Sequence, residues 1–447
     1  MKRKITALLL AMAMVFSLMG ATAAAAETET EEKTTEETAP AQDAAGTLSF
    51  ASLADRVKKN NDTALALGEN IAILDALDYD KLADDLRDGL NEISDAQWAL
   101  RSSGSVSDAL NAYNATEMAS LAGTANGADM VLAKAIDALS SGMAQSTNAQ
   151  LDAQYDALKE QLDNIKKGKL QKENAGIKLQ LQTAQNQIVM AAQTLYITLL
   201  SLERSDAALT RSLAALDRTI EEMELRYEMG QISALQLRQV QAGRTQLLSG
   251  QETMRMNINL LYMQLNSMIG EELGTKLKLQ PLPEVTKASL DAMNAAADYK
   301  RADEVSYETY AAQKARDDAK ESYDDAVKKY GANSKKTEMT QAKHTWQAAQ
   351  YTYDASVQSF SIKFRSQYAK VKDCAQILNA AKEALALEQK EYEVAQLKYQ
   401  QGTISHNALL TAEDEVASAK DTVANAASDL YSAYNNYTWA VNCGILN

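Results

Sequence analysis

Tyr227-Glu-Met-Gly230-Gln-Ile232-Ser233 recurs 172 residues later as Tyr399-Gln-Gln-Gly402-Thr-Ile404-Ser405. In both stretches an apolar helix end is followed by a glycine, and then by a serine that precedes another helical segment. A glycine directly after a helix readily takes the left-handed conformation that ends it, and a serine side chain can cap the first turn of the next helix. The two stretches therefore predict two tight turns between helices, and the fold is built around them.

The self-match extends well beyond the two turns, at the same offset and without a gap. Its clearest pairs are Tyr196 with Tyr368, Leu213 with Leu385, Glu221 with Glu393, Leu225 with Leu397, and Tyr262 with Tyr434. Self-similarity at one fixed offset indicates a duplicated structural unit. Because each copy is centred on a turn, we expect the duplicated unit to be a helical hairpin.

The first hairpin carries a regular apolar seam. Before the turn, apolar residues advance mostly by alternating steps of four and three, interrupted only at Asp206: Ile188, Ala192, Leu195, Leu199, Leu202, Leu209, Leu213, Leu216, Ile220, Met223 and Tyr227. After the turn the rhythm returns in Met254, Ile258, Leu261, Leu265 and Met268. Such a rhythm keeps apolar side chains on one stripe that faces a partner helix. We expect a long antiparallel coiled-coil pair, whose first limb, residues 174–230, is roughly 85 Å long at about 1.5 Å per residue.

The second hairpin has a seam of smaller and more polar residues. Gln367 and Glu388 fall where the first copy has Leu195 and Leu216. One interpretation is looser packing that permits an opening movement, and the other is simple drift after the duplication.

Composition favours helices throughout and excludes nucleic acid as a partner. The chain has only three prolines, Pro40, Pro281 and Pro283, so that kind of helix breaker is missing from residues 41–280 and 284–447. We therefore predict an all-α fold of long antiparallel coiled-coil hairpins in two tandem repeats. The formal net charge is −15 at pH 7. Phosphate contacts need clustered Lys and Arg, and no such cluster stands out in the sequence.

The chain divides into four predicted segments. A basic start, an apolar core and the small residues Ala24-Ala25-Ala26 are typical of a secretory signal peptide, and the Glu- and Thr-rich stretch after it lacks the apolar residues that a folded segment needs. The segments are a signal peptide (1–26), a disordered acidic spacer (27–46), a first helical repeat (47–283, hairpin turn at 230) and a second (284–447, hairpin turn at 402). We expect an exported protein whose mature form has no transmembrane helix, since no later apolar run reaches about 18 residues.

The two cysteines are predicted to be free. Cys374 lies 28 residues before Gly402 and Cys443 lies 41 residues after it. On two straight limbs their heights differ by roughly 20 Å, which is beyond the reach of a disulfide. Cys374 also matches Leu202 of the first copy, which predicts a buried apolar role.

Nothing in the sequence predicts catalysis or a cofactor. The two histidines, His344 and His406, have no cysteine or second histidine at metal-ligand spacing. No glycine-rich phosphate loop, nucleophile elbow or zinc-protease helix motif occurs. We expect that the protein is not an enzyme and carries no metal.

The duplicated helix, Tyr-x-x-Gly-x-Ile-Ser turn and helix in an exported chain resembles the TolC-type outer-membrane efflux family. The resemblance covers most of residues 47–444 and is strongest around both turns. It implies a TolC-like helical barrel in which three chains form a tunnel that meets an inner-membrane pump through a membrane-fusion adaptor. It also implies that the adaptor contacts the hairpin tips, which here are Gly230, Ile232, Ser233, Gly402, Ile404 and Ser405.

The sequence departs from the family's pattern in two respects. Family members carry a pair of strands in each repeat, and a lipid-facing strand needs about 10 residues of alternating character. No such pair is found in residues 101–172 or 299–345, and the second range reads as charged helix. The family also often places acidic residues soon after the second glycine, where this chain has Ala408 and Thr411.

Three functions remain open. The first is a TolC-like exported component of an envelope efflux or secretion system, which forms a helical duct or spacer and docks to an adaptor through its tips. The second is an envelope coiled-coil scaffold or interaction protein without transport activity, and the third is a secreted enzyme. We favour the first, in the cell envelope or outside the cell, and in an outer membrane only if it contains membrane strands that the sequence does not reveal.

Overall fold

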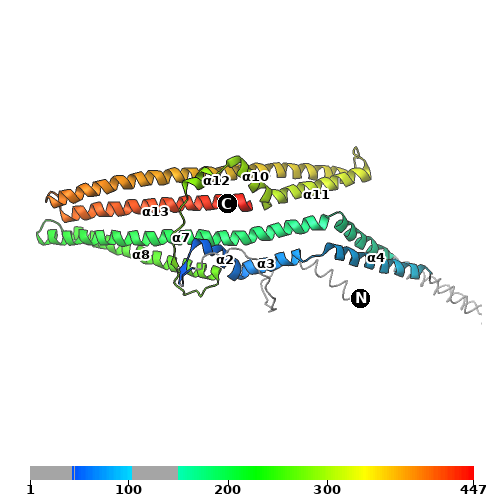
Figure 1. Ribbon diagram of the computed structural model, residues 1–447, viewed down its shortest axis with the longest axis horizontal. Coiled ribbons are helices and arrows are strands. Elements are labelled where there is room, and N and C mark those ends of the chain that lie inside the picture. Colours follow the sequence, from blue (N-terminus) through cyan, green and yellow to red (C-terminus); the bar gives the residue numbers. More distant parts are fainter. Residues whose placement is uncertain (1–42, 45, 103–148, 447) are drawn as a thin grey trace, which may run out of the picture. The chain divides into compact units, whose positions relative to one another are not determined.

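The computed structural model describes residues 43–44, 46–102 and 149–446, and within these ranges it is mostly helical (Figure 1). The predicted signal peptide, residues 27–42 of the predicted spacer, and residues 103–148 of the first repeat lie outside the described residues. The helices are α2 (Phe50–Asn60), α3 (Asp62–Asp75), α4 (Tyr79–Ser102), α7 (Lys169–Glu228), α8 (Ala234–Ile269), α9 (Lys287–Asp291), α10 (Ala295–Val305), α11 (Tyr307–Tyr330), α12 (Thr337–Gln400) and α13 (His406–Cys443). The strands are β1 (Thr47–Leu48) and β2 (Lys278–Leu279).

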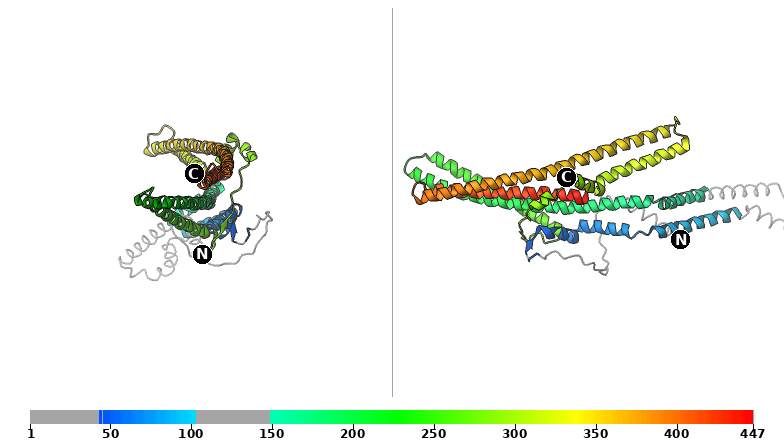
Figure 2. Two further views of the ribbon diagram at one scale, coloured as in Figure 1. Left: turned by 90° about the vertical axis from the view of Figure 1, so that its left-hand side faces the viewer. Right: turned by 45° about the horizontal axis from the view of Figure 1, so that its top comes forward.

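Two long helical hairpins form the framework. In the first, α7 (60 residues) runs antiparallel to α8, and in the second α12 (64 residues) runs antiparallel to α13 (Figures 1 and 2). At about 1.5 Å per residue, α7 is roughly 90 Å long. The prediction of an all-α fold of long antiparallel hairpins is confirmed.

The two hairpins meet through α7 and α13, so that the four long helices follow one another in the order α8, α7, α13, α12. The Gln193 side-chain oxygen accepts hydrogen bonds from the Asn435 side chain at 2.8 Å and from the Trp439 indole at 2.7 Å. Gln193 is buried although it is polar. These two bonds satisfy its buried oxygen and fix how α7 lies against α13.

Each hairpin has its own apolar core well away from the turn. The first core gathers around Tyr196 and Leu199 of α7 and includes residues of α2 and α8. The second gathers around Phe360 and Phe364 of α12 and includes Tyr437 of α13. Leu199 of the predicted first seam is fully buried here, and so are Phe360 and Phe364 of α12. The seams thus pack most tightly around the middle of α7 and α12.

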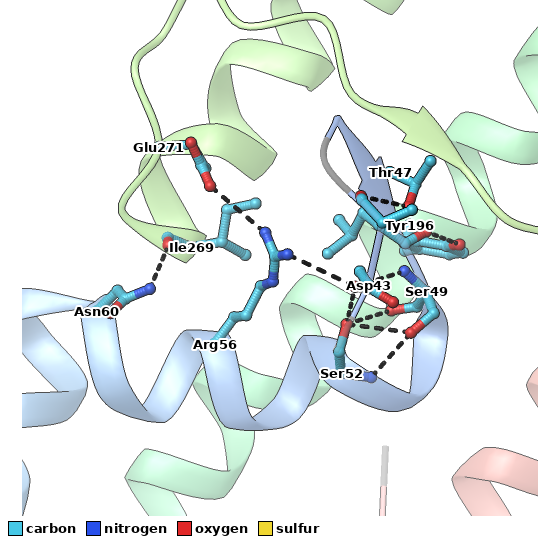
Figure 3. A network of polar contacts seen from close by, with 11 residues as sticks. Asp43, Thr47, Ser49, Ser52, Arg56, Asn60, Tyr196, Ile269 and Glu271 are labelled. Carbon is cyan, nitrogen blue, oxygen red and sulfur yellow. Dashed lines mark hydrogen bonds and ion pairs between the residues drawn. The ribbon is translucent and has the colours of Figure 1, made fainter. Parts of the chain in front are cut away.

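A polar network holds the start of the folded chain together, and Arg56 links it to Glu271, just after α8, at 3.4 Å (Figure 3). The Asp43 carboxylate accepts hydrogen bonds from the Ser49 backbone N–H and the Ser52 hydroxyl, and it pairs with Arg56 at 3.6 Å. Burial raises the pKa of Asp43, but the hydrogen bonds from Ser52 and Ser49 outweigh it and leave this pKa below its ordinary value. Asp43 falls within the predicted spacer, yet it belongs to the folded part of the chain.

Tyr196 ties two distant segments to α7 (Figure 3). Its hydroxyl lies 2.9 Å from the Leu48 carbonyl and 2.7 Å from the Gln280 carbonyl. These segments include β1 and β2, which pair in parallel with Leu48 opposite Leu279. Nothing in the sequence indicated that this short strand, β2, pairs with the start of the chain.

Residues 299–305 and 307–330 are helical, in α10 and α11, and α12 begins at Thr337. The prediction that residues 299–345 form charged helix is therefore confirmed, apart from Ser306 and the turn at residues 331–336. In the first repeat, residues 149–166 are also helical. Among the described helices, none combines the length and the apolar character needed to cross a bilayer.

The second seam is not simply loose where polar residues replace leucine. The Gln367 side chain donates a hydrogen bond to the Ala433 carbonyl of α13 at 2.9 Å, so it bridges the pair instead of leaving a gap. Cys374 packs against the second core, as predicted for a position that matches leucine. Cys374 and Cys443 are both free thiols.

Candidate partner-binding tips

The first tip is a helix end closed by two backbone hydrogen bonds. Gly230 has a φ of 71°, and its N–H donates to the Tyr227 carbonyl at 2.9 Å. The next N–H, of Gln231, reaches back to the Arg226 carbonyl at 2.8 Å. This pair of bonds defines the Schellman motif, in which a left-handed glycine satisfies the last free carbonyls of a helix.

The second tip repeats this geometry. Gly402 has a φ of 69° and its N–H donates to the Tyr399 carbonyl at 2.9 Å. The N–H of Thr403 donates to the Lys398 carbonyl, also at 2.9 Å. The duplication seen in the sequence is therefore a duplication of one turn geometry.

Serines start both helices that leave the tips. The Ser233 hydroxyl accepts from the Gln236 N–H at 3.3 Å, and the Gln236 side chain accepts from the Ser233 N–H at 2.9 Å, which completes a capping box. The Ser405 hydroxyl accepts from the Ala408 N–H at 3.1 Å. Because Ala408 replaces Gln236, the second tip lacks the returning bond.

Large apolar side chains remain uncovered around both turns. In the first hairpin the exposed fractions are 60% for Leu225, 62% for Met229 and 67% for Leu235. In the second, Leu397 is 57% exposed and Tyr399 is 41% exposed. Neighbouring exposed apolar residues are a common feature of interaction surfaces, whereas single ones are unremarkable in any protein.

A cleft lies between the hairpins just behind the tips. It has a volume of about 390 Å³ and is lined by residues of α7 and α13, among them Arg218, Glu222, Asn407, Asp414 and Glu415. Both turns therefore lie at the same end of the paired hairpins. The lining is mostly polar, which suits water or an ionic partner better than an apolar ligand.

Three arginines of α7 face polar partners on α13 at steps of seven residues. Arg204 donates to the Ser428 hydroxyl at 2.6 Å, Arg211 contacts the Asp421 carboxylate, and Arg218 contacts the Asp414 carboxylate. We call these three contacts the arginine ladder. Asp414, one of the acidic residues just beyond Ala408 and Thr411, is thus engaged within the chain.

The predicted tip residues lie where the sequence placed them. Gly230 and Gly402 are exposed, and so are Ser233 and Ser405, while Ile232 and Ile404 are half-buried within the turns. The exposed Leu225, Met229 and Leu235 next to the first turn do not belong to the predicted apolar seam. The periodic pattern therefore gave no reason to expect them to take part in binding.

No catalytic constellation gathers among the described residues. His406 stands at the second tip, where its ring lies 5.6 Å from that of Tyr399, and His344 is on the far part of α12. Within the described ranges, no group of three or more His, Cys, Asp or Glu side chains could hold a metal ion.

Several solved structures resemble this chain. The outer membrane protein VceC from Vibrio cholerae matches with 15% identity and a TM-score of 0.43, over 61% of this chain and 74% of that one. The outer-membrane channel OprN matches with 14% identity and a TM-score of 0.49, over 64% and 72%. The Campylobacter jejuni CmeC outer membrane channel matches with 10% identity and a TM-score of 0.49, over 65% and 68%.

These likenesses concern the fold alone. No protein-family model matches the sequence. No curated protein matches it either.

Proposed function

We propose that this chain is an exported component of an efflux or secretion system of the cell envelope. Copies of it form a helical duct or spacer that docks to an adaptor through the hairpin tips. One observation carries the proposal: two hairpins end at the same place in the same turn, each with uncovered apolar side chains beside it. A turn that served only to reverse the chain would not need exposed leucine on both limbs.

The tips suit another helical protein as partner. Leu225 and Leu235 flank the first turn, and Leu397 lies just before the second. Apolar side chains presented by rigid helices dock well against the apolar stripe of a partner helix. The resemblance to TolC-type proteins supplies the partner's kind, a membrane-fusion adaptor that joins the duct to an inner-membrane pump. The tip residues proposed to bind it are Gly230, Ile232, Ser233, Gly402, Ile404 and Ser405.

The outer helices provide the surfaces through which copies associate. α11 packs along part of α12, and α2 packs against part of α8, while the remaining outer sides of these two helices are uncovered. On α8 this side exposes Met256 and Leu260, and on α12 it exposes Ile362 and Ile377. Two unlike edges favour head-to-tail contacts, which close into a ring when the rotation per copy permits. From the resemblance to TolC-type proteins we propose three copies in that ring.

The segments predicted from the sequence complete the proposal. A signal peptide at residues 1–26 directs export, a spacer follows, and the two repeats at 47–283 and 284–447 each supply one hairpin. The protein then works in the cell envelope, without catalysis of its own.

Photo-crosslinking in cells tests the docking step. A photoreactive amino acid is placed at Leu235 or Leu397 near the tips, and at Ile73 of α3 as a control with a similarly exposed side chain. We expect the tip positions alone to capture a membrane-anchored adaptor with its own helical hairpin. Capture of that adaptor equally from Ile73, or of none from either tip, would contradict the proposal.

A further inference from the structure

Two lysine-rich turns lie at the starts of α7 and α12, at the opposite ends of these helices from the tips. Residues 164–172 and 326–336 each contain four lysines and no acidic residue: Lys166, Lys167, Lys169 and Lys172 in the first, and Lys328, Lys329, Lys335 and Lys336 in the second. Each turn contains a glycine with positive φ, Gly168 at 69° and Gly331 at 84°. The whole chain carries 60 acidic against 45 basic residues, so these two runs differ sharply from the rest.

The fold brings the two turns onto one surface. The Tyr310 hydroxyl of α11 donates to the Lys172 carbonyl of α7 at 3.0 Å. Asp325, near the end of α11, has its pKa lowered by a hydrogen bond from Lys328, by the charge of Lys328, and by the charges of Lys167 and Lys169. Lys328 of the second turn contacts this carboxylate, and the charges of Lys167 and Lys169 of the first turn also act on it. We call the eight lysines together the lysine surface.

Most of this charge is available to a partner. All eight side chains are exposed. Within the described part of the chain, the only ion pair among them joins Lys328 to Asp325 at 2.9 Å. Lys329 and Lys336 lie 5.3 Å and 4.7 Å from the centre of the Tyr330 ring, a contact that orients an ammonium group without neutralising it.

The acidic residues around the lysine surface do not cancel it. Asp324 is already paired with Lys320 at 2.7 Å. Asp163, Glu173, Glu321 and Glu338 border the two acid-free runs and are fewer than the eight lysines. An excess of positive charge thus remains where the starts of α7 and α12 meet, in a protein that is acidic overall.

We propose that the lysine surface binds the anionic headgroups of a phospholipid bilayer. All eight residues are lysine, whose compact charge suits a diffuse negative surface, and no arginine offers the paired contacts that grip a single phosphate. Clustered lysines bind anionic membranes, each contributing about fivefold in affinity. Tyr330 lies half-buried among them, and tyrosine is enriched at the interface between a bilayer and water.

A bilayer fits better than a single-stranded nucleic acid. Binding of unpaired bases relies on aromatic faces that are open for stacking. The nearest large rings, Tyr323 and Trp346, already stack on each other with centroids 5.0 Å apart. The surface therefore offers charge and an interfacial tyrosine, without a free stacking platform.

Vesicle sedimentation with the mature chain tests the proposal. The vesicles contain phosphatidylcholine alone or phosphatidylcholine mixed with phosphatidylglycerol. We expect binding only to the mixed vesicles, with affinity falling as salt shortens the screening length from about 10 Å at 0.1 M. The quadruple variant K328Q/K329Q/K335Q/K336Q should bind at least about tenfold more weakly.

A matched control removes the same charge from α12, away from the lysine surface. The variant K370Q/K382Q/K390Q/K398Q replaces four exposed lysines of α12 and should bind like the unmodified protein. Circular dichroism checks that both variants remain helical. Equal binding by the two variants, or no binding of the unmodified protein to mixed vesicles, would overturn the proposal. Binding to polyphosphate but not to vesicles would assign the surface to a soluble polyanion and would overturn it as well.

Discussion

Arg218 of α7 contacts Asp414 of α13 immediately behind the two tips, and this contact lines the cleft between the hairpins. Arg211 and Asp421 repeat it seven residues away along each helix. In antiparallel helices, equal steps in opposite directions keep the same register. The arginine ladder therefore fixes the register of one hairpin against the other, where few apolar side chains are buried.

Reversing one charge of the ladder should weaken the pairing of the hairpins. We expect Arg218→Asp to destabilise the fold by about 0.5–1 kcal/mol, because both partners are partly exposed and such pairs contribute little each. The exchange Arg218→Asp with Asp414→Arg should recover most of the loss. Urea unfolding measures the free energy of unfolding of the double variant and of each single variant, Arg218→Asp and Asp414→Arg. If the double variant loses as much stability as the two single variants together, the two residues are not coupled.

The tip glycine is required by its backbone conformation and not by lack of space. A Cβ at Gly230 would meet no atom within 4 Å, but its φ is 71°. Gly230→Ala should therefore cost about 1–2 kcal/mol, the usual penalty of the left-handed conformation for other residues. Gly243, in the middle of α8, has equally open surroundings without positive φ. Gly243→Ala should stabilise by about 0.5–1 kcal/mol, so thermal unfolding should show shifts of opposite sign.

Binding of the adaptor is tested with a larger side chain than alanine at the glycines of both tips. The double variant Gly230→Val and Gly402→Val should lose binding to the adaptor while circular dichroism shows nearly unchanged helicity, because the strain is confined to the turns. Co-purification of the adaptor with the unmodified and the double-variant protein measures the difference. Equal recovery of the adaptor with both would show that the tips do not dock.

Asp298 makes the second core sensitive to acid. Burial raises the pKa of this carboxyl, but hydrogen bonds from the Tyr437 hydroxyl at 2.5 Å, the Asn294 N–H and Arg301 together hold it below its ordinary value. The resulting stability is fully present above the ordinary pKa of 3.8 and is lost as pH falls through the lower folded value. Asp298→Asn should cost about 1–3 kcal/mol at pH 7. The free energy of unfolding of the Asp298→Asn variant, measured by urea unfolding, should also depend less on pH below 4 than that of the unmodified protein.

The thiols of Cys374 and Cys443 test whether the two helices of the second hairpin are straight. Burial raises the pKa of both Cys374 and Cys443, so each should react slowly with a thiol reagent in the native protein. After unfolding, titration should count two free thiols per chain. A count of zero in the oxidised protein would mean that the two residues are bridged, and the limbs would then have to bend.

Local signals in the sequence were enough to predict the hairpins. Gly230 and Ser233 each act on backbone groups within a few residues, so their pattern alone defines a helix end and a helix start. The apolar rhythm around Leu199 likewise reports a buried stripe without further information.

Contacts between distant segments could not be predicted in the same way. Tyr196 bridges Leu48 and Gln280, which lie in different parts of the chain, and nothing near Tyr196 marks its partners. The arginine ladder is visible in the sequence as a pattern, since Arg204, Arg211 and Arg218 recur every seven residues. Their partners could not be predicted, because they depend on which helix packs against α7. The lysine surface was missed because each turn alone is a short run, and only the fold adds the two together.

The mass and shape of residues 27–447 in detergent-free buffer test the central claim most directly. Light scattering gives the number of copies, and negative-stain electron microscopy shows whether they enclose a channel. The proposed function predicts a hollow trimer, in which the outer edge of α8 in one copy meets that of α12 in the next. A monomer that persists at high concentration would contradict the duct and would favour an envelope scaffold built from the same hairpins.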